Sequence, residues 1–182
     1  MPRLIFLQGG EDVRERVNRS MFEDIVKLSR VKSILVVPWT GDDEEKESNY
    51  IAVFEEYFRD VGFREITFLL RNDEDTEIET KFSRADVLYL PGGDPEILKR
   101  EIERRSLQKR IKEFDGIIVG NSAGAIVLSR RGCVSKDCYD GFGIVGISVA
   151  VHATTQSIEE AKGVDGAIIG IPEGTWIVIR PS

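Results

Sequence analysis

The sequence has 182 residues, of which 41% are hydrophobic and 31% charged, and its net charge is −7. This composition is typical of a globular protein, and we expect a single domain over residues 1–182. The acidic charge argues against a nucleic-acid partner, because acidic surfaces repel phosphate backbones. The apolar runs are too short to span a membrane, and the N-terminus lacks a signal-peptide pattern. We therefore expect a cytoplasmic protein, either a monomer or a homodimer.

Short apolar runs alternate with amphipathic segments along the chain. Strands are predicted at residues 4–7, 33–38, 66–70, 87–90 and 116–120. Apolar residues recur at helical spacing over 13–28 and 50–61, charged helix follows over 95–114, and a short helix over 123–129. The acidic run 73–77 is interpreted as a solvated loop, and the β-rich last part contains runs at 143–151, 167–171 and 176–179. This alternation predicts a three-layer α/β fold: a mostly parallel sheet with helices on both faces.

The cysteines and the histidine give no metal-binding pattern. The chain has two cysteines, Cys133 and Cys138, and one histidine. No CxxC pair is present, so we predict no metal site. Two thiols five positions apart could form a disulfide, but free thiols are the expected state in a cytosolic protein.

The run Gly120-Asn121-Ser122-Ala123-Gly124-Ala125 follows a predicted buried strand and opens a predicted helix. In this context GxSxG indicates a nucleophile elbow, a sharp turn that exposes a serine at the carboxyl end of the sheet. The small neighbours avoid collisions in the turn. The start of the helix also places free N–H groups beside a developing oxyanion. Ser122 is therefore the candidate nucleophile.

A serine nucleophile needs a base, and His152 is the chain's sole histidine. It ends the β-type run 147–151, downstream of the serine. The base in turn needs an orienting carboxylate. Two acids stand out by their position: Asp137, between serine and histidine, and Glu173, in a turn after an apolar strand.

A second glycine-rich turn, Gly92-Gly93, follows the strand 87–90. Its backbone could supply an oxyanion donor alongside the amide of Ala123. Gly92 and Asp94 on the same turn are candidate substrate-binding residues.

Taken together, these residues resemble the peptidase E family of serine peptidases, which includes aspartyl dipeptidases and cyanophycinases and has a class I glutamine amidotransferase-like fold. The family's G-x-S-A-G-A elbow is matched at 120–125 and its Gly-(Leu/Ile)-Pro-Glu-Gly-Thr turn at 170–175. Its Gly-Gly-Asn-Thr-like turn is matched partly at 92–95, and its strand-ending histidine by His152. A family aspartate fifteen residues after the serine corresponds to Asp137, since 122 + 15 = 137.

The resemblance implies that Ser122 attacks a carbonyl with His152 as general base and Glu173, or else Asp137, as orienter. The amides of Gly93 and Ala123 would form the oxyanion hole, without metal or cofactor. The implied substrates are short peptides, with dipeptides bearing an N-terminal aspartate as one option.

The sequence differs from the family pattern at two places that concern substrate recognition. The family's Asn-Thr after Gly-Gly is Asp94-Pro95 here. Aspartyl dipeptidases have an arginine-bearing segment after the histidine, suited to a substrate carboxylate. Residues 153–169 contain no arginine and one lysine, Lys162.

Two alternatives remain open from sequence. An α/β-hydrolase esterase shares GxSxG, although its histidine is usually separated from the serine by more than thirty residues (152 − 122 = 30). A non-catalytic binding module on the same amidotransferase-like fold would accommodate the altered 92–95 turn, although the intact set of catalytic candidates argues against it.

Overall fold

The computed structural model describes residues 2–39, 41–161 and 166–181, so Lys162 lies outside the described residues. Its central sheet consists of six strands: β1 (Leu4–Gln8), β2 (Ser33–Val36), β3 (Glu65–Phe68), β4 (Val87–Leu90), β5 (Ile117–Asn121) and β10 (Trp176–Ile179). Their order is β10–β1–β5–β4–β2–β3, and all neighbours are parallel except β10, which pairs with β1 in antiparallel orientation. The predicted mostly parallel sheet is confirmed.

The central strands are mostly apolar because both of their faces are buried. On β1, Ile5 and Leu7 enter one apolar cluster and Phe6 the other. On β4, Leu88 enters the first cluster and Tyr89 the second.

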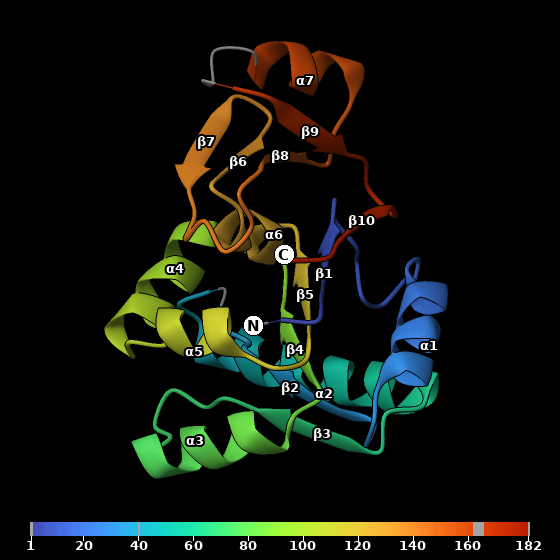
Figure 1. The fold of residues 1–182 in the computed structure, drawn as a ribbon, viewed down its shortest axis with the longest axis vertical. Coiled ribbons are helices and arrows are strands. Elements are labelled where there is room, and N and C mark those ends of the chain that lie inside the picture. The colour runs from blue at the N-terminus through green and yellow to red at the C-terminus, as the bar shows by residue number, and fades with distance from the viewer. Residues whose placement is uncertain (1, 40, 162–165, 182) are drawn as a thin grey trace.

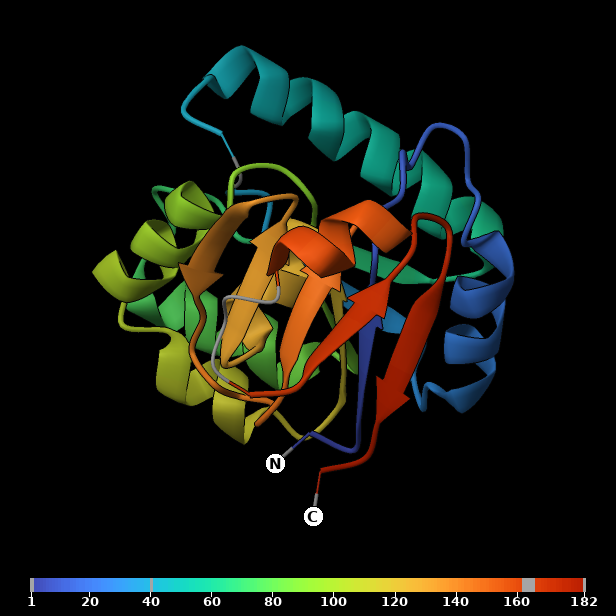
Figure 2. The same cartoon turned by 90° about the horizontal axis from the view of Figure 1, so that it is seen from above.

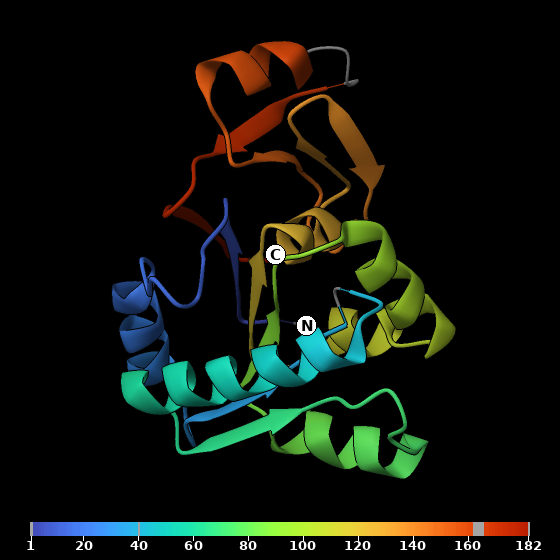
Figure 3. The ribbon, with the colours of Figure 1, turned by 180° about the vertical axis from the view of Figure 1, so that it is seen from behind.

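Two helices, α1 (Arg19–Leu28) and α2 (Glu44–Val61), cover one face of the central sheet, and Figure 3 shows α2 running along it. Their aromatic side chains meet Tyr89 of β4 edge to face. Ring centroids are 5.7 Å apart for Phe22–Tyr89 and 5.1 Å for Phe58–Tyr89. Such T-shaped pairs add about 0.5–1.5 kcal/mol each beyond the burial of apolar area.

The opposite face is covered by α3 (Asp75–Arg84), α4 (Pro95–Arg104), α5 (Gln108–Glu113) and α6 (Ala123–Leu128). The helical region predicted over 95–114 is thus two helices, separated where Ser106 adopts a φ of 54°. The acidic run at 73–77 is not a loop throughout, because α3 begins within it. The N–H of Glu74 donates to the Glu77 carboxylate over 2.9 Å, one half of a capping box.

A second, four-stranded sheet accounts for most of the β-rich last part of the chain. It consists of β6 (Arg131–Val134), β7 (Asp137–Asp140), β8 (Ser148–Val151) and β9 (Ile168–Ile171), in the order β7–β6–β8–β9. All six residues of α6 are buried, and their apolar side chains belong to one cluster with Val149 and Val151 of β8. Figure 1 shows α6 between the two sheets and α7 (Thr155–Glu160) on the outer side of the second, and Figure 2 shows this sheet from above.

The two cysteines form a disulfide, so the prediction of free thiols is wrong. Cys133 on β6 and Cys138 on β7 are directly opposite in an antiparallel pair, with Cα atoms 4.1 Å apart. The spacing of five residues is that of two facing positions on a tight hairpin. The free-thiol prediction relied on the expected compartment and overlooked this hairpin.

Candidate active site

Ser122 lies between β5 and α6 in a strained backbone conformation, with φ 46° and ψ −101°. Positions 120 and 124, on either side of this turn, have no room for a Cβ atom. A Cβ on Gly120 would lie 2.7 Å from the carbonyl carbon of Gly124, and one on Gly124 would lie 2.1 Å from the Leu90 carbonyl oxygen. A strained serine enclosed by glycines at the end of a parallel strand is the geometry of a nucleophile elbow.

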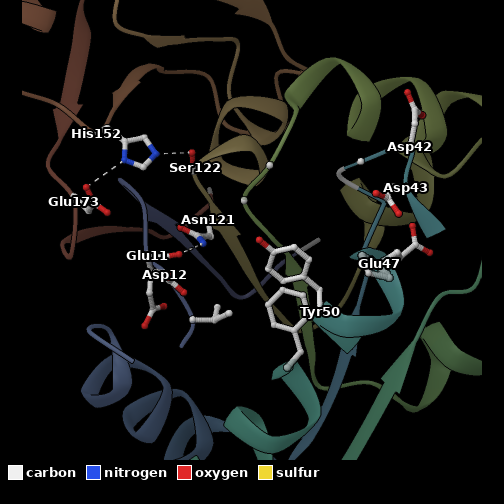
Figure 4. Close-up of a pocket in the computed structure, with 16 residues that line it drawn as sticks. Glu11, Asp12, Asp42, Asp43, Glu47, Tyr50, Asn121, Ser122, His152 and Glu173 are labelled. Atoms are coloured by element: carbon white, nitrogen blue, oxygen red, sulfur yellow. Dashed lines mark hydrogen bonds and ion pairs between the residues drawn. The ribbon is translucent and has the colours of Figure 1, made fainter. Parts of the chain in front are cut away.

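His152 directly follows β8 and reaches the serine from the second sheet. Its Nε2 lies 2.9 Å from the Ser122 Oγ (Figure 4). For Nε2 to accept the hydroxyl proton, the ring proton must be on Nδ1. Ser122 and His152 are therefore at the distance that a serine nucleophile and its base would need.

Glu173 lies on the other side of the imidazole, in the turn between β9 and β10. Its Oε2 is 3.6 Å from His152 Nδ1, and the two side chains are 67% and 38% exposed. This separation is beyond an ordinary hydrogen bond, and catalytic contacts often tighten when substrate binds. The turn itself is closed by a hydrogen bond from Thr175 Oγ1 to the Pro172 carbonyl over 2.7 Å.

The structure does not bring Asp137 to His152. Asp137 is the first residue of β7, exposed, and it lines a separate hollow at the outer edge of the second sheet together with Lys136 and Glu160. Of the two candidate orienters, only Glu173 lies against the imidazole.

Gly9 and Gly10, directly after β1, hold His152 and the turn that carries Glu173 in place. The Gly9 carbonyl accepts the His152 N–H over 2.7 Å, and the Gly10 carbonyl accepts the Gly174 N–H over 2.9 Å. Gly10 has φ +149°, and a Cβ there would lie 2.1 Å from His152 Cε1. Sequence analysis missed this pair, although a double glycine directly after a predicted strand was a visible signal.

The predicted oxyanion donors lie on the two turns that flank the nucleophile. Ala123 is the first residue of α6, where a helix has free N–H groups, and Gly93 has φ +137°. Within the described residues neither amide donates a hydrogen bond to other backbone groups outside its own element. Gly92 and Gly93 both line the pocket around Ser122.

Asp94 has a different place from the one predicted. Its Oδ1 accepts the N–H groups of Glu96 and Ile97 over 2.8 and 3.1 Å, so it caps the start of α4. It is not among the described residues that line the pocket around Ser122.

The pocket around Ser122 has a volume of about 500 Å³. Its walls include residues that sequence analysis gave no role: Glu11 and Asp12 after β1, Asp42, Asp43 and Glu47 around the start of α2, Tyr50 on α2, and Asn121 before the nucleophile. For Asn121 and the pair after β1, the signal was their position at the carboxyl ends of β5 and β1. The residues near α2 had no signal beyond their charge.

Glu11 is partly buried, and its carboxylate is well supplied with donors. Its Oε1 accepts the Asn18 N–H over 2.8 Å and the Tyr57 hydroxyl over 2.9 Å. Burial nevertheless outweighs these hydrogen bonds and raises the pKa of the Glu11 carboxyl above its ordinary value.

No group of three or more potential metal ligands occurs among residues 2–39, 41–161 and 166–181. In the same part of the chain, no helix is long and apolar enough to cross a membrane.

Comparisons with known proteins place this geometry in a family. The model of peptidase family S51 matches residues 4–182. The uncharacterized peptidase Lmo0363 of Listeria monocytogenes is 24% identical in an alignment of 162 positions that covers 78% of each chain. A cobyrinate a,c-diamide synthase of Methanocaldococcus jannaschii is 33% identical over 89 residues, and the match spans 47% of this chain but only 19% of the synthase.

Solved structures share the fold. A peptidase from an acI-B1 Actinobacterium superposes with a TM-score of 0.71 at 23% identity, covering 98% of this chain and 88% of that one. A structure assigned as a peptidase E protein from Listeria monocytogenes EGD-e has a TM-score of 0.70 at 18% identity and covers 99% of both chains. The predicted resemblance and fold class are thereby confirmed, as is the assignment to the serine-type peptidases. The chain belongs to peptidase family S51.

Proposed function

We propose that this chain hydrolyses short peptides through an acyl-enzyme on Ser122, with His152 as general base and Glu173 as the residue that orients it. The observation that supports the proposal most directly is the 2.9 Å contact between Ser122 Oγ and His152 Nε2. Family membership supplies the reaction class, and Glu173 is the one predicted orienter that lies beside the imidazole.

In the first half-reaction, His152 Nε2 takes the hydroxyl proton while Ser122 Oγ bonds to the carbonyl carbon of the substrate. The amides of Gly93 and Ala123 donate to the resulting oxyanion. When the tetrahedral intermediate collapses, the C–N bond breaks and the imidazolium protonates the leaving amine.

In the second half-reaction, water attacks the acyl-enzyme and again gives its proton to His152. The products are a free carboxylate and regenerated Ser122. Glu173 stabilises the imidazolium in both steps by facing Nδ1. Each bond that forms or breaks is balanced by a proton that His152 accepts and returns.

A fluorophosphonate probe and a dipeptide library together test the proposal. We expect the probe to label Ser122, as located by mass spectrometry, and library peptides to be cleaved. Ser122→Ala should abolish both. Ser83→Ala, which removes an exposed hydroxyl on α3, is the matched control and should change neither. An unlabelled folded protein, or equal turnover by Ser122→Ala, would overturn the proposal.

A further inference from the structure

The pocket that contains the nucleophile is lined by acidic residues. Six carboxylate side chains border it: Glu11, Asp12, Asp42, Asp43, Glu47 and Glu173. Among the residues whose side chains the structure describes, which leave out residues 44–46, no lysine or arginine does so. Carboxylates gathered in a concave site focus a negative potential there and attract cations.

The carboxylates stand on two walls (Figure 4). Glu11 and Asp12 follow β1 on the wall of the nucleophile, where the Asn121 Nδ2 donates to the Glu11 carbonyl over 3.3 Å. Asp42, Asp43 and Glu47 stand on the wall formed at the start of α2, across the pocket from the Ser122–His152 pair. A substrate bound at Ser122 therefore has acidic groups both beside it and across from it.

Only part of this charge is neutralised by the protein. Asp42 pairs with Arg100, and Glu47 with Arg71, each over 2.9 Å, from arginines that do not line the pocket.

On the wall of the nucleophile, neither Glu11 nor Asp12 forms an ion pair within the described part of the chain. Among the residues whose side chains the structure describes, Glu11 and Asp12 thus have no cationic partner, whereas Asp42 and Glu47 each have one.

Asn121 provides an independent indication of a hydrogen-bond donor in the ligand. Its side chain is on the pocket wall between Ser122 and Glu11, and the residue is only 2% exposed (Figure 4). Its Oδ1 accepts no hydrogen bond within the described residues. A buried amide oxygen without a partner is costly, and a donor brought by the substrate would satisfy it.

We infer that the pocket selects cationic peptides: those with a free α-ammonium group and a lysine or arginine side chain on the residue whose carbonyl Ser122 attacks. The inference rests on the proposed function, because it takes Ser122 as the nucleophile. The α-ammonium is two bonds from the attacked carbon, so it stays on the wall of Glu11, Asp12 and Asn121. The long basic side chain reaches the wall of Asp43 and Glu47. An N-terminal aspartate would meet only like charge here.

Three dipeptides that differ in one side chain test this inference: Arg-Leu, citrulline-Leu and Asp-Leu. Citrulline keeps the shape of arginine without its charge. We expect kcat/KM for Arg-Leu to exceed that for citrulline-Leu by about tenfold or more, the effect of one charge-assisted hydrogen bond. Asp-Leu should be the poorest substrate, and added salt should reduce the preference for Arg-Leu.

Single substitutions test which carboxylate is responsible for the preference for arginine over citrulline. Asp43→Asn, which keeps the shape of the side chain, should lower the Arg-Leu to citrulline-Leu ratio by about threefold or more. Asp140→Asn is the matched control, because Asp140 pairs with Arg131 on the second sheet outside the pocket, and it should retain the wild-type ratio. If Asp43→Asn does not fold, Asp12→Asn on the other wall takes its place.

The outcomes separate the inference from the proposed function. If no peptide is cleaved and the fluorophosphonate does not label Ser122, the proposed function itself fails. If Ser122 is labelled and peptides are cleaved, but Arg-Leu and citrulline-Leu react equally or Asp-Leu reacts best, the peptidase stands and the inference is overturned. A second readout needs no turnover: arginine amide should slow the labelling of Ser122 more than citrulline amide does.

Discussion

Gly10→Ala tests whether the base is held where the structure places it. The added Cβ would lie 2.1 Å from His152 Cε1, whereas ordinary contact begins at 3.4 Å, so the imidazole must retreat by about 1.3 Å. A retreat of that size from Ser122 would lengthen the 2.9 Å Oγ–Nε2 contact to about 4.2 Å, too long for a hydrogen bond. The φ of +149° also disfavours alanine.

Loss of the general base costs about 10²–10⁴ in rate, and we expect kcat/KM of Gly10→Ala to fall by about 10² or more. Steady-state hydrolysis and the rate of fluorophosphonate labelling measure the loss, with circular dichroism to verify folding. Gly146→Ala is the control, because nothing lies within 4 Å of its added Cβ. A folded Gly10→Ala enzyme as active as Gly146→Ala would refute the reasoning.

Three further predictions concern the orienter, a buried acid and the disulfide. Glu173→Gln should lower kcat by about tenfold or more while Asp137→Asn stays near wild type; equal losses in steady-state assays would contradict the choice of Glu173. Because the pKa of the Glu11 carboxyl is raised, the folded protein binds more protons than the unfolded chain at acidic pH, and ionised Glu11 lowers stability at higher pH. Urea unfolding should therefore show Glu11→Gln more stable than wild type at pH 8, with the gain shrinking towards pH 4. A gain that grew on acidification would be inconsistent with this sign. Reducing Cys133–Cys138 should lower the free energy of unfolding by at most about 2 kcal/mol, as expected for so short a loop, and leave hydrolysis unchanged; a loss of activity would link the hairpin to the site.

Sequence reasoning worked where local pattern and tertiary environment agree. The fully buried strands read as continuous apolar runs, and the elbow at Ser122 needs glycines for steric reasons that are local to the turn. His152 was identified as the candidate base because it is the sole histidine in the sequence. Its contact with the serine joins residues thirty positions apart and was predicted from the family motif and chain order.

Sequence reasoning failed where a charge has a tertiary partner. Asp73 was interpreted as part of a solvated run, but it is 5% exposed and pairs with Lys81 over 2.6 Å.

The first residue of α1 was also predicted wrongly. Val17 was counted in the apolar stripe of a helix, but α1 begins only at Arg19 and Val17 is 58% exposed. Periodicity marks a helix without fixing its first residue.

The acidic pocket was invisible in the sequence for a related reason. Asp12 and Asp43 lie thirty-one positions apart, and only the order of strands in the central sheet brings the ends of β1 and β2 to one edge. The expectation of a single domain and that of a cytoplasmic location stay predictions.

The position of α6 between the two sheets has a consequence for inactivation by heat. Ser122 is anchored to one sheet and His152 to the other, so the two reactive atoms stay aligned only while both sheets remain docked on this buried helix. If the smaller sheet separated from α6, the enzyme would lose its activity while most of its secondary structure persisted. On slow heating, peptide hydrolysis should therefore be lost several degrees before the far-ultraviolet signal changes.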